Sequence, residues 1–358
     1  MQILDTIKEL NACFGPSGCE EEIRNKIAEL AKPFADEMYT DVMGNLIVVK
    51  KAAGKRGAAK ADNFNEAKAG AEMPAAAKAG TPRLMFAAHM DSLGLIVTYI
   101  EENGLLRFGV VGLVEPTDLK AIPVRFANGT VGTVYSDTGA DKPGIDDLFI
   151  DIGASSRKEA EKLVQKGDMA VFDTPARALA GDLIVSPYLD NRAGAAAQLL
   201  ALAAVKKPAY DCCFVFTTQE EVGRRGAKPA AFGVDPQYAV VCDATRTDDQ
   251  PKSRHQGTTI PGKGAAIKVM DKSVICHPEM VAALKAIADE KKIAWQTDVL
   301  QEGGTDGTEM RKTAGGVWTG GVSIPVRYVH SPQEVCCTAD IEAAARLMAA
   351  FAETKPGF

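Results

Sequence analysis

Apolar residues recur along the chain at two spacings, and the spacings predict alternating helices and strands. Apolar positions three and four residues apart predict helical structure over 3–31, with a turn at the sequence Gly-Pro-Ser-Gly of residues 15–18. The same spacing predicts helices at 191–205, 279–290 and 339–352. Short apolar runs predict strands at 45–49, 84–88, 213–217, 238–242, 265–270, 295–300 and 321–329.

The pattern changes between residues 92 and 172. Short apolar runs alternate there with Gly, Pro and Asp at close spacing, which is typical of a compact β-rich unit, and one helix-like stretch covers 156–166. On both sides of this region strands alternate with helices, which indicates a mostly parallel sheet. We therefore predict an α/β domain made from residues 1–91 and 173–358, with a β-rich domain inserted at 92–172.

Residues 52–81 form an Ala-, Lys- and Gly-rich stretch with few large apolar residues. Such a composition cannot build a core. Because the stretch separates two predicted strands of the α/β domain, we interpret it as a low-complexity loop insertion whose lysines are solvated. A second interpretation is that these lysines line an entrance for acidic peptides.

Composition and charge narrow the classes of function. The 358 residues carry 41 basic and 47 acidic side chains, so the net charge is 41 − 47 = −6, without a sustained basic run. This argues against nucleic acid or an anionic membrane as a partner. Neither a membrane-spanning apolar run nor a signal peptide is visible. The eight cysteines lack a Cys-x-x-Cys spacing, so we interpret them as reduced core thiols of a cytoplasmic protein.

Potential metal ligands follow several of the predicted strands, at the strand ends where open α/β sheets bind their ligands. The candidates are His89, Glu220, Glu221, Asp243 and His330 after strands, and Asp190 just before a helix. Because the chain has only four histidines, this repeated placement is unlike chance. Histidine and carboxylate ligands suit zinc, and also cobalt or manganese.

The number of candidates allows two metal ions if one carboxylate bridges them. Asp190 is the best bridge, since it stands apart from the other ligand positions. Asp91, two residues after His89, is placed to orient the imidazole through a hydrogen bond. Neighbouring residues of a strand point in opposite directions, so we assign Glu221 to a metal and Glu220 to the general base.

Five segments together resemble the tetrahedral aminopeptidases. These are di-zinc metallopeptidases similar to glutamyl and deblocking aminopeptidases, and they are sometimes mislabelled as endoglucanases. The segments are Ala88-His89-Met90-Asp91, Leu189-Asp190-Asn191-Arg192-Ala193-Gly194, Gln219-Glu220-Glu221-Val222-Gly223, Gly303-Gly304-Thr305-Asp306 and Arg327-Tyr328-Val329-His330-Ser331-Pro332. The resemblance implies an α/β catalytic domain interrupted by a β-barrel dimerisation domain. It also implies a tetrahedral dodecamer, built from dimers, that admits short peptides.

Carried over residue by residue, the resemblance implies that His89 and Asp243 hold one metal ion, most often zinc, while Glu221 and His330 hold the other. It makes Asp190 the bridge and Glu220 the base. The chain departs from the family pattern in two places: the 52–81 insertion is long, and Asp306 is followed by Gly307-Thr308-Glu309 where the family more often has a small residue.

Several alternatives remain at this point. The nearest is another di-zinc hydrolase, either a carboxypeptidase or an amidohydrolase acting on N-acyl amino acids. A polysaccharide hydrolase would use Glu220 and Glu221 as its acid pair, but neighbouring residues are poorly placed for the roughly 5–9 Å carboxyl separation that glycosidases need. A shell-forming protein without catalysis is the non-enzyme alternative. We expect Asp306 to be structural rather than substrate-binding, and His255 and His277 to be loop and turn residues.

Overall fold

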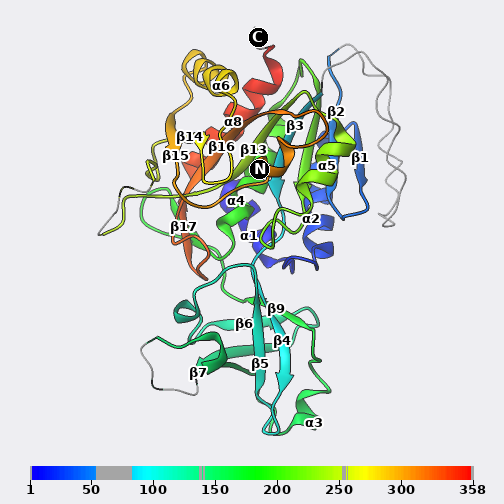
Figure 1. Ribbon diagram of the computed structural model, residues 1–358, viewed down its shortest axis with the longest axis vertical. Helices are drawn as coiled ribbons and strands as arrows, with labels where there is room; N and C mark the ends of the chain where they lie inside the picture. The colour runs from blue at the N-terminus through cyan, green and yellow to red at the C-terminus, as the bar shows by residue number, and fades with distance from the viewer. Residues whose placement is uncertain are drawn as a thin grey trace.

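The computed structural model describes residues 2–53, 83–136, 139, 142–251, 255 and 257–355. The chain forms an α/β part, and a smaller lobe rich in β-strands projects below it (Figure 1). The lobe contains a closed barrel, and the chain enters it after β3 and leaves it before β10. The 52–81 insertion predicted from composition lies, apart from Ala52 and Ala53, outside the described residues.

The α/β part is organised around one large sheet with the strand order β1-β2-β12-β3-β13-β16-β17-β11-β10. The central strands β12, β3, β13 and β16 are parallel to one another, and antiparallel strands extend both edges. Strand β14 pairs with β16 and with β15 beside this path. The strands are β1 (Glu37–Thr40), β2 (Leu46–Lys50), β3 (Arg83–His89), β10 (Arg177–Ala178), β11 (Leu183–Ser186), β12 (Asp211–Thr217), β13 (Tyr238–Arg246), β14 (Ala265–Met270), β15 (Trp295–Val299), β16 (Trp318–Arg327) and β17 (Glu334–Cys337).

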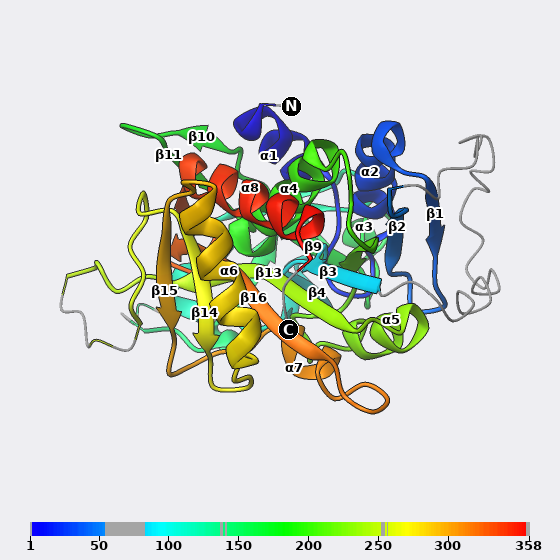
Figure 2. The same ribbon diagram turned by 90° about the horizontal axis from the view of Figure 1, so that it is seen from above.

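Helices cover both faces of the sheet, as the view from above shows (Figure 2). Because side chains alternate along a strand, Phe86 of β3 packs in the core beneath α1, α2, α4 and α8, while Met85 packs on the opposite face with α5. The helices are α1 (Ile3–Ala12), α2 (Glu21–Ala31), α4 (Leu189–Ala204), α5 (Ala227–Val234), α6 (Pro278–Glu290), α7 (Gly307–Met310) and α8 (Thr338–Glu353), with a 3-10 turn η1 (Lys32–Phe34).

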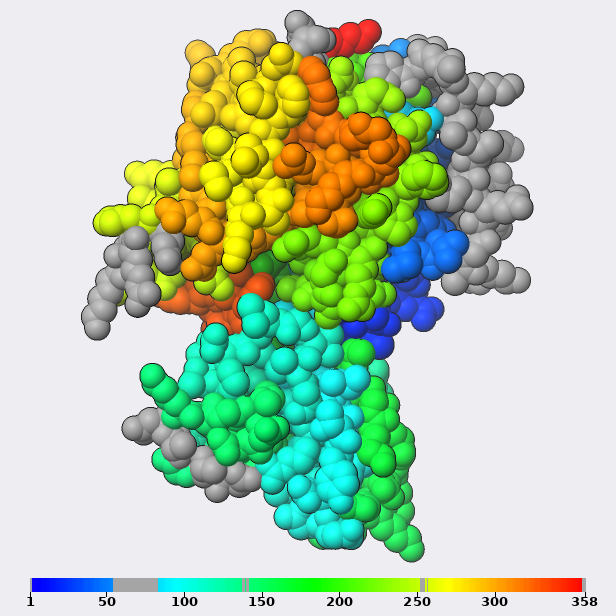
Figure 3. Space-filling model, in the orientation of Figure 1, coloured from blue at the N-terminus to red at the C-terminus, as the bar shows by residue number. Residues whose placement is uncertain are grey.

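The barrel has the strand order β4-β5-β8-β7-β6-β9, and every pair within it is antiparallel. It has its own apolar core, separate from the cores of the sheet, and it stands out as a distinct lobe on the molecular surface (Figure 3). The elements are β4 (Gly94–Ile100), β5 (Leu106–Val111), β6 (Pro123–Phe126), β7 (Val131–Ser136), β8 (Leu148–Asp151), β9 (Met169–Phe172), α3 (Arg157–Ala160), η2 (Pro116–Asp118) and η3 (Ile145–Asp147).

The predicted fold class is confirmed: an α/β part with a parallel sheet at its centre and an inserted barrel. Several details differ from expectation. The strand expected at 238–242 continues to Arg246, so Asp243 lies within β13 and not after its end. The helix expected at 156–166 is only the single turn Arg157–Ala160. The strand expected to end at 329 ends at Arg327, so His330 lies in the hairpin that leads to β17. Among the described residues, no helix is both long and apolar enough to cross a bilayer.

Candidate metal centre

Three adjacent parallel strands bring the candidate ligands to one edge of the sheet. His89 is the last residue of β3, and Asp243 lies in the neighbouring strand β13. Glu220 and Glu221 follow β12, which pairs with β3 on its other side and ends at Thr217. Because these strands run in register, Asp243 is level with the ends of β3 and β12, although β13 itself continues to Arg246, and the side chains at this level converge.

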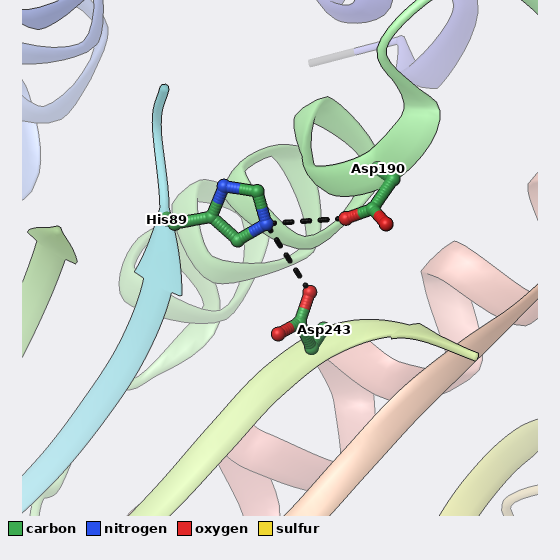
Figure 4. A group of neighbouring side chains, drawn as sticks. All are labelled: His89, Asp190 and Asp243. Carbon is green, nitrogen blue, oxygen red and sulfur yellow. Dashed lines mark hydrogen bonds and ion pairs between the residues drawn. The ribbon is translucent and has the colours of Figure 1, made fainter. Parts of the chain in front are cut away.

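His89 forms the first candidate metal group with two aspartates (Figure 4). Its Nε2 atom lies 3.1 Å from Asp190 Oδ1 and 3.5 Å from Asp243 Oδ1. The imidazole is buried, with 2% of its side chain exposed. Burial alone would lower the pKa of His89, but Asp243, Asp190 and Asp91 together raise it well above its usual value.

His330 forms the second candidate group with Asp190 and Glu221. Its Nε2 atom lies 3.5 Å from Asp190 Oδ2 and 3.5 Å from Glu221 Oε2. The two oxygens of Asp190 therefore face different histidines: Oδ1 faces His89 and Oδ2 faces His330. This is the arrangement that a bridging carboxylate between two metal ions requires.

The charges in this cluster fit a cation. Burial, together with Asp190, raises the pKa of Glu221 well above its usual value. Asp190 behaves differently, because hydrogen bonds from His330 and His89 lower its pKa despite the burial. Several buried carboxylates thus crowd around two imidazoles, and they can be ionised together only if positive charge is added. The donor set of imidazoles and carboxylates suits zinc, cobalt or manganese.

Glu220 stands beside the two groups without belonging to either. It lines the same cavity, of about 370 Å³, as the candidate ligands, and Arg224 Nε donates a hydrogen bond to its Oε1 at 3.2 Å. The sequence argument for separating it from Glu221 is wrong in its premise. The pair lies in a turn after β12, where strand alternation does not apply, and Gln219 just before it has φ +55°.

Asp91 joins His89 to the turn that carries both glutamates. Its Oδ1 atom lies 3.5 Å from His89 Nδ1 and accepts the Glu220 N–H at 3.0 Å. Its Oδ2 atom accepts the Glu221 N–H at 3.2 Å and the Ser17 hydroxyl at 2.6 Å. The backbone carbonyl oxygen of Asp91 also lies 3.2 Å from His89 Nδ1, so this one buried residue fixes both the orientation of the imidazole and the position of the turn.

Sequence reasoning missed Glu334, the first residue of β17. Its two oxygens accept the N–H groups of Asp190 and His330, at 2.8 and 2.7 Å. The available signal in the sequence was the position of this acid directly before the apolar run Val335-Cys336-Cys337, just as Glu220 and Glu221 come after an apolar run. Ser17 was also missed, because its segment was interpreted only as a turn.

The remaining candidates lie outside the two groups. Asp306 is buried beside the site, where the Thr217 hydroxyl donates a hydrogen bond to it, and it is not among the residues that line the cavity. His277 precedes α6 and stacks on Trp318 with ring centroids 3.9 Å apart. His255 is 93% exposed and lies 3.4 Å from Asp248. Neither histidine belongs to a candidate metal group in the part of the chain that the structure describes.

Known proteins resemble this chain over nearly its full length. A family model described as M42 glutamyl aminopeptidase matches residues 72–347. A putative aminopeptidase of Acetivibrio thermocellus is 42% identical, over 97% of this chain and 97% of that protein.

Solved structures agree with the sequence comparison. An aminopeptidase of the archaeon Desulfurococcus kamchatkensis superposes with a TM-score of 0.88 at 34% identity, over 99% of this chain and 95% of that one. The Pyrococcus horikoshii TET1 peptidase, which can assemble into a tetrahedron or a large octahedral shell, gives 0.83 at 30% identity, over 98% and 99%. The chain belongs to the M42 glutamyl aminopeptidase family and is a hydrolase of the aminopeptidase class.

Proposed function

We propose that this protein is a two-metal aminopeptidase that removes N-terminal residues from short peptides. The observation that carries the proposal is the placement of Asp190, whose two oxygens face two separate histidine-carboxylate groups. In this proposal His89 and Asp243 hold one divalent ion, Glu221 and His330 hold the other, and Asp190 bridges them. Zinc is the first choice, with cobalt or manganese as alternatives.

The residues around the proposed ions have different roles. Bound divalent ions polarise a carbonyl and make water acidic enough to be deprotonated near neutral pH. Glu220, held by Arg224 at the edge of the cavity, accepts the proton from the attacking water and donates it to the leaving amine. Asp91 keeps Nε2 of His89 turned toward Asp190 and Asp243 while it holds Glu220 in place. We therefore propose that Asp91, like Glu220, is needed for catalysis.

We further propose that residues 92–172 form a dimerisation domain, that 1–91 and 173–358 form the catalytic domain, and that dimers build a tetrahedral dodecamer. The barrel exposes apolar side chains on β7, where Val131 is 60% exposed and Tyr135 46% exposed. A relative of similar fold can assemble into a tetrahedron or a large octahedral shell. Light scattering coupled to size-exclusion chromatography tests this, and a monomer at micromolar concentration would contradict it.

We place the protein in the cytoplasm. This rests on its eight free thiols, seven of which are buried, since thiols persist in reducing compartments. Mass-spectrometric mapping of cysteines in protein alkylated directly in cells tests the location. Disulfide-bonded cysteines in that sample would contradict it.

The proposed activity is tested with matched chromogenic substrates. Aminoacyl p-nitroanilides with a free α-amine should be hydrolysed after zinc, cobalt or manganese is added, and a chelator should abolish the reaction. The N-acetylated forms of the same substrates should be inert. Hydrolysis of N-acyl amino acids, or of C-terminal residues only, would instead support an amidohydrolase or a carboxypeptidase. Activity that survives complete metal removal would overturn the two-metal mechanism.

A further inference from the structure

Glu334 occupies a position where two distant segments of the chain meet. In the register of the sheet it is opposite Ser186 at the end of β11, and Asp190 follows Ser186 by four residues. It also follows His330 by four residues, across the hairpin between β16 and β17. One side chain at this point can therefore contact both the segment that carries Asp190 and the hairpin that carries His330.

The carboxylate uses both oxygens for this purpose. Oε2 accepts the Asp190 N–H at 2.8 Å, and Oε1 accepts the His330 N–H at 2.7 Å. The hairpin has little regular hydrogen bonding of its own here, because β16 ends at Arg327 and both Tyr328 and His330 have positive φ angles, of 60° and 69°. The bond from His330 to Glu334 therefore fixes a turn that the sheet does not hold.

The burial of Glu334 costs more free energy than a purely structural link requires. It is 1% exposed, and in the described part of the chain its ionised form is met by backbone N–H groups rather than by an ion-paired cation. Burying a carboxylate without a cationic partner costs several kcal/mol, which neutral side chains would avoid. It is neither in a candidate metal group nor among the residues that line the cavity.

We infer that Glu334 is a positioning residue that sets the affinity of the metal site formed by Asp190, Glu221 and His330. Its carboxylate holds Asp190, the proposed bridge, and His330 at a fixed separation. The inference rests on the two-metal site proposed above. Loss of partners that orient ligands typically weakens metal binding about 10- to 100-fold. Here the loss should fall mainly on the ion of the His330 group, because both hydrogen bonds of Glu334 hold ligands of that group and only the bond from Asp190 holds a ligand of the His89 group.

The test compares Glu334→Gln with the wild-type protein by calorimetric titration of the metal-free protein with zinc. The glutamine has the same shape, but its amide group faces one of the two N–H donors and breaks that hydrogen bond. The wild type should bind two ions. The variant should bind the first ion nearly as tightly as the wild type does and the second about 10- to 100-fold more weakly, and excess zinc should restore full occupancy. Glu334→Asp, which is too short to reach both donors, should behave in the same way.

The chain offers a matched control in Asp340. This buried acid likewise accepts two backbone N–H groups, from Gly262 and Gly264, at 2.7 Å each, but it belongs to neither metal group. Asp340→Asn should therefore change stability without changing either zinc affinity. A double variant of Glu334→Gln with His330→Ala should bind zinc no more weakly than His330→Ala alone, because both changes act on one site.

The outcomes separate the inference from the proposed function. Two unchanged zinc affinities in Glu334→Gln, or equal weakening of both ions, would overturn the role of Glu334 and leave the two-metal site intact. A wild-type protein that binds fewer than two ions in excess zinc would overturn the proposed two-metal function, and the inference with it.

Discussion

The two halves of the proposed metal site are built in different ways. His89 and Asp243 come from β3 and β13, which are paired strands in the middle of the sheet, and their side chains are 2% and 6% exposed. On the other side, His330 comes from a hairpin and is 25% exposed. The sheet itself assembles the first half, whereas the second half needs Glu334 to hold its hairpin in place.

This difference has a consequence for metal binding. Ligands fixed by strand pairing lose little freedom when an ion binds, and ion–ligand attraction is screened less in a buried group than in an exposed one. In the His330 half, by contrast, the backbone of His330 is held by the hydrogen bond that its N–H donates to Glu334. We therefore expect the His89 half to retain its ion more strongly than the His330 half, with Asp190 common to both.

The largest effect should follow from removing the residue that the halves share. Asp190→Ala deletes a ligand from both groups, so the purified variant should contain neither ion, as measured by elemental analysis. Activity should fall on the order of 10⁴-fold, because metal activation is worth several kcal/mol. Asp5→Ala, an acid in the first turn of another helix, is the control and should change neither quantity. An Asp190→Ala protein that keeps one tightly bound ion would show that the halves are independent.

Glu220→Gln should leave both halves filled and still reduce turnover. Glu220 lines the cavity but is not a member of either group. Loss of a general base typically costs about 10²- to 10⁴-fold in rate. The measurement is kcat on an aminoacyl p-nitroanilide together with the zinc content of the same sample. A variant with two zinc ions and undiminished kcat would remove Glu220 as the base.

A smaller effect separates the halves directly. Stepwise chelation of the wild type should release the ion of the His330 half first. The affinities of the two halves for zinc should differ by roughly tenfold, which corresponds to about 1.4 kcal/mol. His330→Ala should then bind a single ion with the higher affinity, whereas His89→Ala should lose that tight site. If His330→Ala loses the tighter ion instead, our ranking of the two halves is reversed.

The same contrast explains what could be predicted from the sequence. The strands β3, β12 and β13 contain continuous apolar runs, so their existence was visible, and the ends of β3 and β12 were predicted to within one residue. The end of β13 was not, because the strand continues beyond its apolar run to Arg246, with Asp243 inside it. Parallel register then brings Asp243 level with the ends of β3 and β12. His330 was found as a residue type, but its hairpin was not, because the turn depends on a hydrogen bond from a residue that is not itself a ligand.

Other parts of the fold were less visible for a related reason. The barrel strands β6, β8 and β9 have four residues each. Runs this short carry little periodicity, so the region was predicted as β-rich without its strand order. The closure of the barrel and the edge strands of the sheet depend on pairings between segments far apart in sequence. Helices α5 and α7 were missed because they are short.

The smallest predicted effect concerns Asp340, the buried acid that resembles Glu334 but lies outside both halves. Burial raises the pKa of Asp340 from 3.8 to about 6, although hydrogen bonds from Gly262 and Gly264 oppose the rise. The folded protein therefore holds this proton more tightly than the unfolded chain. The resulting stabilisation is fully present below the unfolded pKa of 3.8 and is lost as the pH rises through about 6.

As the pH rises from about 4 to about 7, the ionisation of Asp340 should therefore lower the free energy of unfolding by about 1–2 kcal/mol. Asp340→Asn cannot titrate, so urea unfolding across this range should show a flatter dependence on pH for the variant than for the wild type, with metal-free protein used for both. The other buried acids titrate equally in the two proteins and cancel in the difference. Parallel curves would show that the two backbone hydrogen bonds outweigh burial at Asp340. A buried carboxylate could then link two segments without a raised pKa, and the cost assigned to Glu334 would have to be reduced accordingly.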